Sequence, residues 1–164
     1  MVRVCRDGGA LLETIIAMVI VAIFLSGLHL TNSQVMSQVR GSLESGAALR
    51  LLSGRREQVR ASTWTQMTDV NFLQTTLLAE EPDSCAELGS VVETIELNAP
   101  LVPPVTLSRL PSGTVQVVNA GDGTMKDQLS VRVELTASWT GKGGHAHTRQ
   151  VSLIVAQGGL LGRN

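Results

Sequence analysis

The sequence predicts an α+β fold in which a long N-terminal helix, transmembrane in its first half, packs on a C-terminal antiparallel β-sheet. Three observations predict this fold. An apolar run lies near the N-terminus, at 10–30. Apolar residues then continue at helical spacing to about Ala61, and from Ser90 onward they alternate with polar residues. The 164 residues suffice for one small domain and a membrane anchor.

The composition excludes several classes of protein. Hydrophobic residues make up 43% of the chain and charged residues 16%, which is too apolar and too weakly charged for a disordered protein. The formal net charge is -1 and aromatic residues make up 2%, so the chain lacks the positive field and the stacking side chains of nucleic-acid binders. The two cysteines exclude a disulfide-dense scaffold. We therefore expect no nucleic-acid partner.

The first element is the apolar run from Ala10 to Leu30, which has the length that a helix needs to cross the hydrocarbon core of a bilayer. Arg3 and Arg6 precede the run, and positive charge in this place holds an N-terminus in the cytoplasm. A cleaved secretory signal fits less well, because the run is long and only a poor small-residue cleavage site follows it. We expect a retained single-pass anchor in contact with membrane lipid.

One acidic residue, Glu13, lies inside this apolar run. A carboxylate near the hydrocarbon boundary costs about 2–3 kcal/mol on insertion scales, and less if it stays close to the headgroups. Glu13 therefore either reaches the interface or has a positive partner. Acidic residues in membrane segments are candidates for function, and Glu13 is the first candidate site residue.

The helix is predicted to continue beyond the membrane segment. Its apolar positions recur every four residues, at Val35, Val39, Leu43, Ala47 and Leu51. This spacing predicts one helix from about 10 to about 61, with an amphipathic second half at 31–61 whose apolar stripe packs on a globular domain. Arg40, Arg55 and Arg56 are interpreted as lying outside the stripe. The helix is expected to end at 62–64, with Trp64 packed beneath the following loop.

The remaining residues, 62–164, are predicted to form a globular region with a variable loop at 62–89 and an antiparallel sheet at 90–157. A short helix is expected at 70–78. Strands are predicted at 91–97, 114–118, 129–136 and 147–156, with turns at 119–123 and 141–144. The segment 105–110 is expected to form at most an edge strand, because four prolines crowd around it: Pro100, Pro103, Pro104 and Pro111.

The N-terminus resembles the class III signal of type IV pilins and type II secretion pseudopilins. That signal is a short charged leader ending in Gly, a cleavage site directly after it, and an apolar helix with Glu at its fifth position. Here the leader is 1–8, the cut follows Gly8, and the mature chain begins GALLE, with Gly9 first and Glu13 fifth. The resemblance implies a pilin-like fold with a transmembrane and filament-core helix at 9–30. It also implies that a prepilin peptidase removes the leader and that the new N-terminus at Gly9 is methylated.

The resemblance implies that the chain is a minor pseudopilin, a structural subunit of a type II secretion pseudopilus. It would lie in the bacterial inner membrane, with a cytoplasmic N-terminus and a periplasmic C-terminal domain, before it enters the filament. Its partners would be other pilin or pseudopilin subunits, the prepilin peptidase and the inner-membrane assembly platform. In the filament, the Glu13 carboxylate would pair with the Gly9 amine of a neighbouring subunit, an attraction that a low dielectric strengthens.

Two alternatives remain open. The same signal serves minor type IV pilins of a pilus or competence system. An uncleaved, signal-anchored periplasmic binding module would instead keep residues 1–8, and the mass of the mature N-terminus separates it from the pilin-like subunits. Cleavage would also remove Cys5 and leave Cys85 as a single thiol.

No residue pattern predicts catalysis. The sequence contains no nucleophile–base–acid set, phosphate-binding loop or paired carboxylates, so we expect no enzymatic activity and no cofactor. His145 and His147 would need a further ligand to bind a metal. Asp122 and Asp127 flank a Gly-rich loop that does not match the regular calcium-binding pattern. We therefore expect no metal site.

Overall fold

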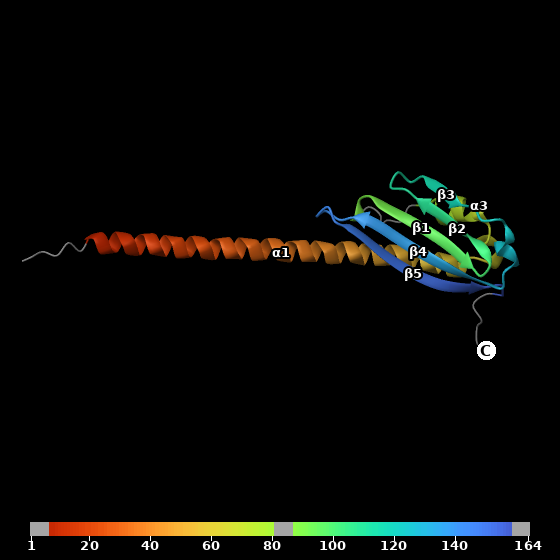
Figure 1. The fold of residues 1–164 in the computed structure, drawn as a ribbon, viewed down its shortest axis with the longest axis horizontal. Coiled ribbons are helices and arrows are strands. Elements are labelled where there is room, and N and C mark those ends of the chain that lie inside the picture. Colours follow the sequence, from red (N-terminus) through yellow and green to blue (C-terminus); the bar gives the residue numbers. More distant parts are fainter. Residues whose placement is uncertain (1–6, 81–86, 159–164) are drawn as a thin grey trace, which may run out of the picture. The chain divides into compact units, whose positions relative to one another are not determined.

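The computed structural model describes residues 7–80 and 87–158, and it confirms the α+β class. Helix α1 spans Asp7–Ala61, which confirms the predicted long N-terminal helix. The chain divides into two compact units, Met1–Gly41 and Ser42–Asn164. In its described part the first unit consists of α1 alone, whereas the second contains the end of α1, the short helices and the sheet (Figure 1).

The sheet has five antiparallel strands in the order β3-β2-β1-β4-β5 (Figure 1). The strands are β1 Val91–Ala99, β2 Val102–Arg109, β3 Val115–Asn119, β4 Ser130–Thr140 and β5 Ala146–Ala156. In the register at the centre of the sheet, Val133 of β4 lies opposite Leu97 of β1 and Leu153 of β5. Every second residue of β1 and β4 is buried, as the alternation in the sequence predicts.

The core lies between the inner face of the sheet and the last turns of α1. The buried apolar residues of α1 are Ala47, Ala48, Leu51, Leu52 and Val59. They belong to one cluster with the inward-facing strand residues Val91, Ile95, Leu97, Val105, Leu107, Val131, Val133, Leu135, Ala137 and Trp139. The predicted apolar stripe is thus covered from Ala47 onward, whereas its first members, Val35, Val39 and Leu43, are exposed.

Short helices connect α1 to the sheet. They are α2 Trp64–Met67, α3 Val70–Phe72 and a π-helical turn, η1 Leu73–Leu77, so the short helix predicted at 70–78 is confirmed. The Thr63 hydroxyl accepts from the Gln66 backbone N–H, and the Gln66 side chain accepts from the Thr63 backbone N–H. This reciprocal cap starts a new helix directly after α1. Trp64 is partly buried against the core, and its Nε1 donates to the Lys126 carbonyl oxygen at 3.1 Å.

The prediction that 105–110 forms at most an edge strand is wrong. β2 lies inside the sheet, between β1 and β3, and it includes Pro103 and Pro104. Proline removes a ladder donor, but β3 pairs with β2 only from Thr106 onward, so the prolines precede the part of β2 that has two neighbours. The register between β2 and β1 also shifts beside the prolines, and such a β-bulge accommodates the irregular pairing.

Candidate functional site

The first candidate site is the part of α1 that lies outside the core. Every side chain from Leu12 to Leu43 is exposed in the single chain, including the large apolar residues Ile20 at 61% and Phe24 at 66%. An 18-residue window reaches a mean hydropathy of 2.2, so α1 is long and apolar enough to cross a membrane. Apolar surface on this scale marks a membrane or protein contact. The helix is therefore compatible with a single-pass membrane anchor.

Two hydroxyl groups in this segment are satisfied within the helix. The Ser26 hydroxyl donates to the Ala22 carbonyl oxygen at 2.8 Å, and the Thr31 hydroxyl donates to the Gly27 carbonyl oxygen at 2.9 Å. In hydrocarbon no water is present to pair with such groups, so a hydroxyl must find its partner in protein. These two bonds remove the main obstacle to placing Ser26 and Thr31 in or near a bilayer.

The predicted cleavage and assembly residues lie at the beginning of α1. Gly8 and Gly9 follow Asp7 in the first turn, and Glu13 comes four residues after Gly9, on the same face of the helix. The Glu13 side chain is exposed. The sequence contains no Lys or Arg between Glu13 and Arg40, so this stretch of the helix offers the carboxylate no permanent cation. Residues 1–6 of the predicted leader lie outside the described residues.

A polar cluster lies where the apolar stripe enters the core. Glu44 accepts through Oε2 from Nε1 of Trp139 at 3.4 Å, and through Oε1 from the backbone N–H of Lys142 at 3.2 Å. One residue further along α1, Ser45 Oγ accepts from the Arg149 guanidinium at 2.8 Å. These bonds attach the β4–β5 hairpin to α1 at the turn where burial of the helix begins.

Three charged side chains lie in the core, and the sequence analysis missed them. Arg55 of α1, Glu93 of β1 and Arg109 of β2 are 2%, 3% and 3% exposed. Glu93 accepts from Nε of Arg55 at 2.8 Å and from Nη1 of Arg109 at 3.0 Å. Arg55 also donates to the carbonyl oxygens of Leu77 and Glu80. The cluster thus joins α1, the end of η1 with the residues that follow it, and two strands.

The sequence did contain a signal for this cluster. Arg55 follows Ala47 and Leu51 at the same four-residue spacing, so it belongs to the stripe, and placing it outside the stripe was wrong. Glu93 and Arg109 likewise occupy inward-facing positions of their strands. Charged residues at positions that the pattern assigns to apolar side chains are buried only when they are paired. Charges of both signs in such positions predict an internal ion-pair network.

The candidate metal ligands are not brought together. His145 and His147 are exposed, and the His147 ring stacks on Trp139 with the ring centroids 5.4 Å apart. Over residues 7–80 and 87–158, no three His, Cys, Asp or Glu side chains are grouped so that they could hold a metal ion. Cys5 and Cys85 lie outside these ranges.

The loop that contains Asp122 and Asp127 is closed by its own hydrogen bonds. Asp122 Oδ1 accepts from the hydroxyl of Thr124 at 2.5 Å and from the backbone N–H of Thr124 at 3.0 Å. These two bonds, the side-chain bond first, hold the pKa of the Asp122 carboxyl below its usual value. The arrangement is an Asx turn before the short 3₁₀ helix at Thr124–Asp127.

Comparison with known proteins returns no match: no protein-family model, no curated protein and no solved structure is significantly similar to this chain.

Proposed function

We propose that this chain is a structural subunit of a pilin-like filament, a minor pseudopilin of a type II secretion system. In this proposal a prepilin peptidase cuts the chain after Gly8, and the subunit is held in the inner membrane with a periplasmic C-terminal domain until it is extracted into the filament. The single observation that carries the proposal is the uncovered apolar helix, Leu12 to Leu43, with one carboxylate near its start.

The length of the uncovered segment favours a filament subunit over a plain membrane anchor. About 20 helical residues cross the hydrocarbon core, and the apolar run at 10–30 already supplies them. Val35, Val39 and Leu43 come after this run and are still exposed. An anchor has no need for apolar side chains there, because they contact water. Neighbouring subunits would cover them, and each fully buried side chain of this size contributes about 1.5–3 kcal/mol.

Glu13 fits this proposal because cleavage creates the cation that its part of the helix lacks. Removal of residues 1–8 frees an amine at Gly9, near the edge of the bilayer. In the filament the Glu13 carboxylate would meet the Gly9 amine of a neighbouring subunit, away from water, where a single unpaired charge is costly. This pairing would select the axial register in which each carboxylate has its amine.

The proposal is tested first at the N-terminus. Intact-protein mass spectrometry of the chain, expressed with an active prepilin peptidase, should give the mass of residues 9–164, with or without an added methyl group. Gly8→Leu should leave the full-length mass, since the larger side chain blocks close approach of the peptidase to the backbone. A wild-type protein that keeps Met1 in these cells is the uncleaved, signal-anchored module.

Assembly is tested at Glu13. Glu13→Val should abolish recovery of the chain in the sheared filament fraction, because the freed amine loses its partner. Glu57→Val is the matched control, since Glu57 is an exposed acid of the same helix that forms ion pairs with Arg56 and Arg60. It should assemble as the wild type does. Normal recovery of Glu13→Val would exclude the pairing.

A further inference from the structure

One end of the sheet carries apolar side chains that the fold leaves open. At the tip between β1 and β2, Leu101 is 106% exposed, and its φ of 64° lies in the left-handed region. A branched residue rarely adopts this conformation, and strained, exposed positions are often kept for function. Pro100, beside it, is exposed as well, and Ile154 of β5 is 62% exposed.

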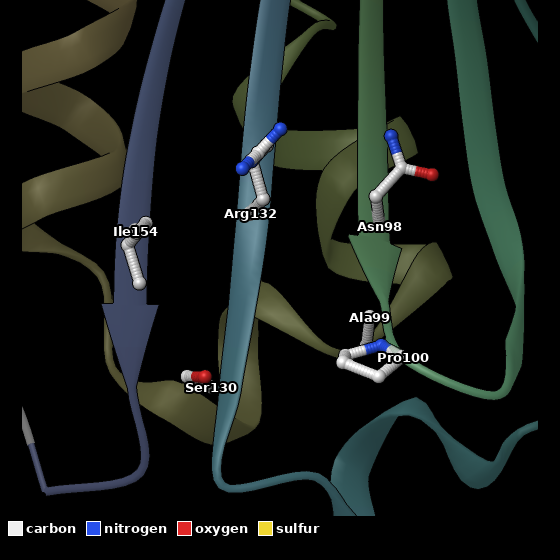
Figure 2. Close-up of a pocket in the computed structure, with 6 residues that line it drawn as sticks. All are labelled: Asn98, Ala99, Pro100, Ser130, Arg132 and Ile154. Atoms are coloured by element: carbon white, nitrogen blue, oxygen red, sulfur yellow. The ribbon is translucent and has the colours of Figure 1, made fainter.

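Next to this tip lies a shallow hollow on the outer face of the sheet. The end hollow has a volume of about 360 Å³ and is lined by Asn98, Ala99, Pro100, Ser130, Arg132 and Ile154. Figure 2 shows Asn98, Arg132 and Ile154 side by side on the neighbouring strands β1, β4 and β5, with Pro100 and Ser130 at the strand ends. The lining of the hollow is thus half apolar and half polar and includes the Arg132 guanidinium, and Leu101 adds a large exposed apolar side chain at the adjacent tip.

Two carboxylates lie two residues along the strands from Asn98 and Arg132, on the same face of the sheet as the hollow. Glu96 and Glu134 lie directly opposite each other on β1 and β4, and like charges in this register repel. Asn98 donates to Glu96 at 3.0 Å and Gln150 donates to Glu134 at 2.9 Å, whereas Nη1 of Arg132 makes only a long ion pair with Glu134, at 3.9 Å. With two acids and one guanidinium, the rim favours an approaching cation.

We infer that the end hollow and Leu101 receive the exposed helix stripe, Val35, Met36, Val39 and Leu43, of a second copy of this chain. The stripe is apolar, exposed, and lies outside the membrane run. It extends about 12 Å along the helix axis, and the hollow extends about 10 Å from β1 to β5. Arg40 follows Met36 by four residues and precedes Leu43 by three, so it flanks the stripe and can meet Glu96 and Glu134.

This contact joins two different surfaces of the chain, so it is heterologous, and it builds an open filament when the rotation between copies does not close a ring. Each copy offers its end hollow to one neighbour and its helix stripe to another. The inference rests on the proposed filament function and adds to it the surface that positions the globular units along the assembly.

Cysteine cross-linking tests the contact directly. Two chains of different tag size, both with Cys5→Ser and Cys85→Ser, are co-expressed, one with Val39→Cys and one with Ile154→Cys. Mild oxidation of assembled material should give a disulfide-linked species at the summed mass. Val39→Cys with Thr148→Cys is the control, since Thr148 is an exposed residue of β5 near its opposite end. Equal yields from both pairs, or no linked species in assembled material, would overturn the inference.

Exchanging the charges of Arg40 and Glu134 tests whether these two side chains meet in the contact. Arg40→Glu should reduce recovery in the sheared fraction by roughly tenfold, the size of effect expected for a charge pair that becomes repulsive. The double variant Arg40→Glu, Glu134→Arg should restore it. Arg40→Glu with Glu87→Arg should not, because the exposed Glu87 precedes β1, at the opposite end of that strand from Asn98. Failure of the Glu134 exchange to restore recovery contradicts the contact.

A substitution at Leu101 tests the effect on assembly separately from the effect on folding. Leu101→Asn should keep or raise the melting temperature, because Asn adopts a positive φ more readily than Leu, yet it should lower recovery in the sheared fraction. Val118→Asn, at a 65% exposed position of β3, is the control and should assemble normally. If the wild-type chain is neither cut after Gly8 nor assembled, the proposed function fails and this inference with it. If the wild type is cut and assembles while the variants behave as it does, only this inference fails.

Discussion

Two parts of α1 have the same apolar spacing and opposite surroundings. Val39 and Leu43 are 49% and 65% exposed, whereas Ala47 and Leu51, the next residues on the stripe, are 0% and 1% exposed. An apolar side chain stabilises a fold only when it leaves water. Periodicity therefore predicts a helix and its apolar face, whereas the residues that cover this face are supplied by the rest of the molecule or by another molecule.

The covered part of α1 is held by charge as well as by apolar packing, and breaking that charge cluster should have the largest effect. Glu93→Ala leaves Arg55 without the carboxylate that it binds in the core. Removing one partner of a buried ion pair costs about 3–5 kcal/mol. We expect a loss of this size in the free energy of unfolding, measured by guanidinium titration of the full chain in detergent micelles. Both tryptophans lie in the unit 42–164, so their fluorescence reports on it.

Glu87→Ala is the matched control. Glu87 also pairs with an arginine of α1, Arg50, but the two side chains are 56% and 61% exposed. Exposed pairs contribute about 0–1 kcal/mol, so this variant should unfold almost as the wild type does. Equal losses for the two variants would mean that burial does not distinguish the two pairs.

Alanine substitutions in the buried and the exposed part of the apolar stripe test whether the two parts contribute differently to stability. Leu51→Ala should lower the free energy of unfolding by about 2–5 kcal/mol, because it leaves a cavity beneath the sheet. Val39→Ala, at a position twelve residues earlier on the same stripe, should leave the unfolding of the single chain unchanged. In the filament fraction, the variant at Val39 should instead reduce recovery. A large loss of single-chain stability for Val39→Ala would show that this part of the stripe is covered within the chain.

Much of the fold could be predicted from local pattern. Two-residue alternation was enough to predict β1, β4 and β5, and four-residue spacing was enough to predict α1, because each pattern repeats over many residues. β2 could not be predicted, since its tolerance of Pro103 and Pro104 depends on where β3 pairs with it. That information lies in the partner strand.

The candidate sites also differ in how far the sequence alone could predict them. Gly8 and Glu13 are identified by spacing within one short segment, so the sequence suffices to propose them. The cluster of Arg55, Glu93 and Arg109 brings together residues that are up to 54 positions apart in the sequence, and no spacing rule connects them. The end hollow likewise depends on the register of three strands, and only the assembled sheet brings its lining residues together.

The smallest effect is expected from replacing a glycine by alanine in each of the two parts of α1. Gly54 and Gly41 both lie within α1, and a methyl group added at either position would meet no atom within 4 Å. In a helix interior Ala is more favourable than Gly by about 1 kcal/mol. Gly54→Ala should therefore raise the free energy of unfolding of the unit 42–164 by about that amount, because this part of the helix forms together with the core. Gly41→Ala should raise helicity in circular dichroism without moving the unfolding midpoint of that unit, since the residue belongs to the other one. The same substitution thus measures whether helix formation is coupled to the core. An equal shift of the midpoint for both variants would place Gly41 in the same cooperative unit as Gly54, and the division drawn between the two parts of α1 would move toward the N-terminus.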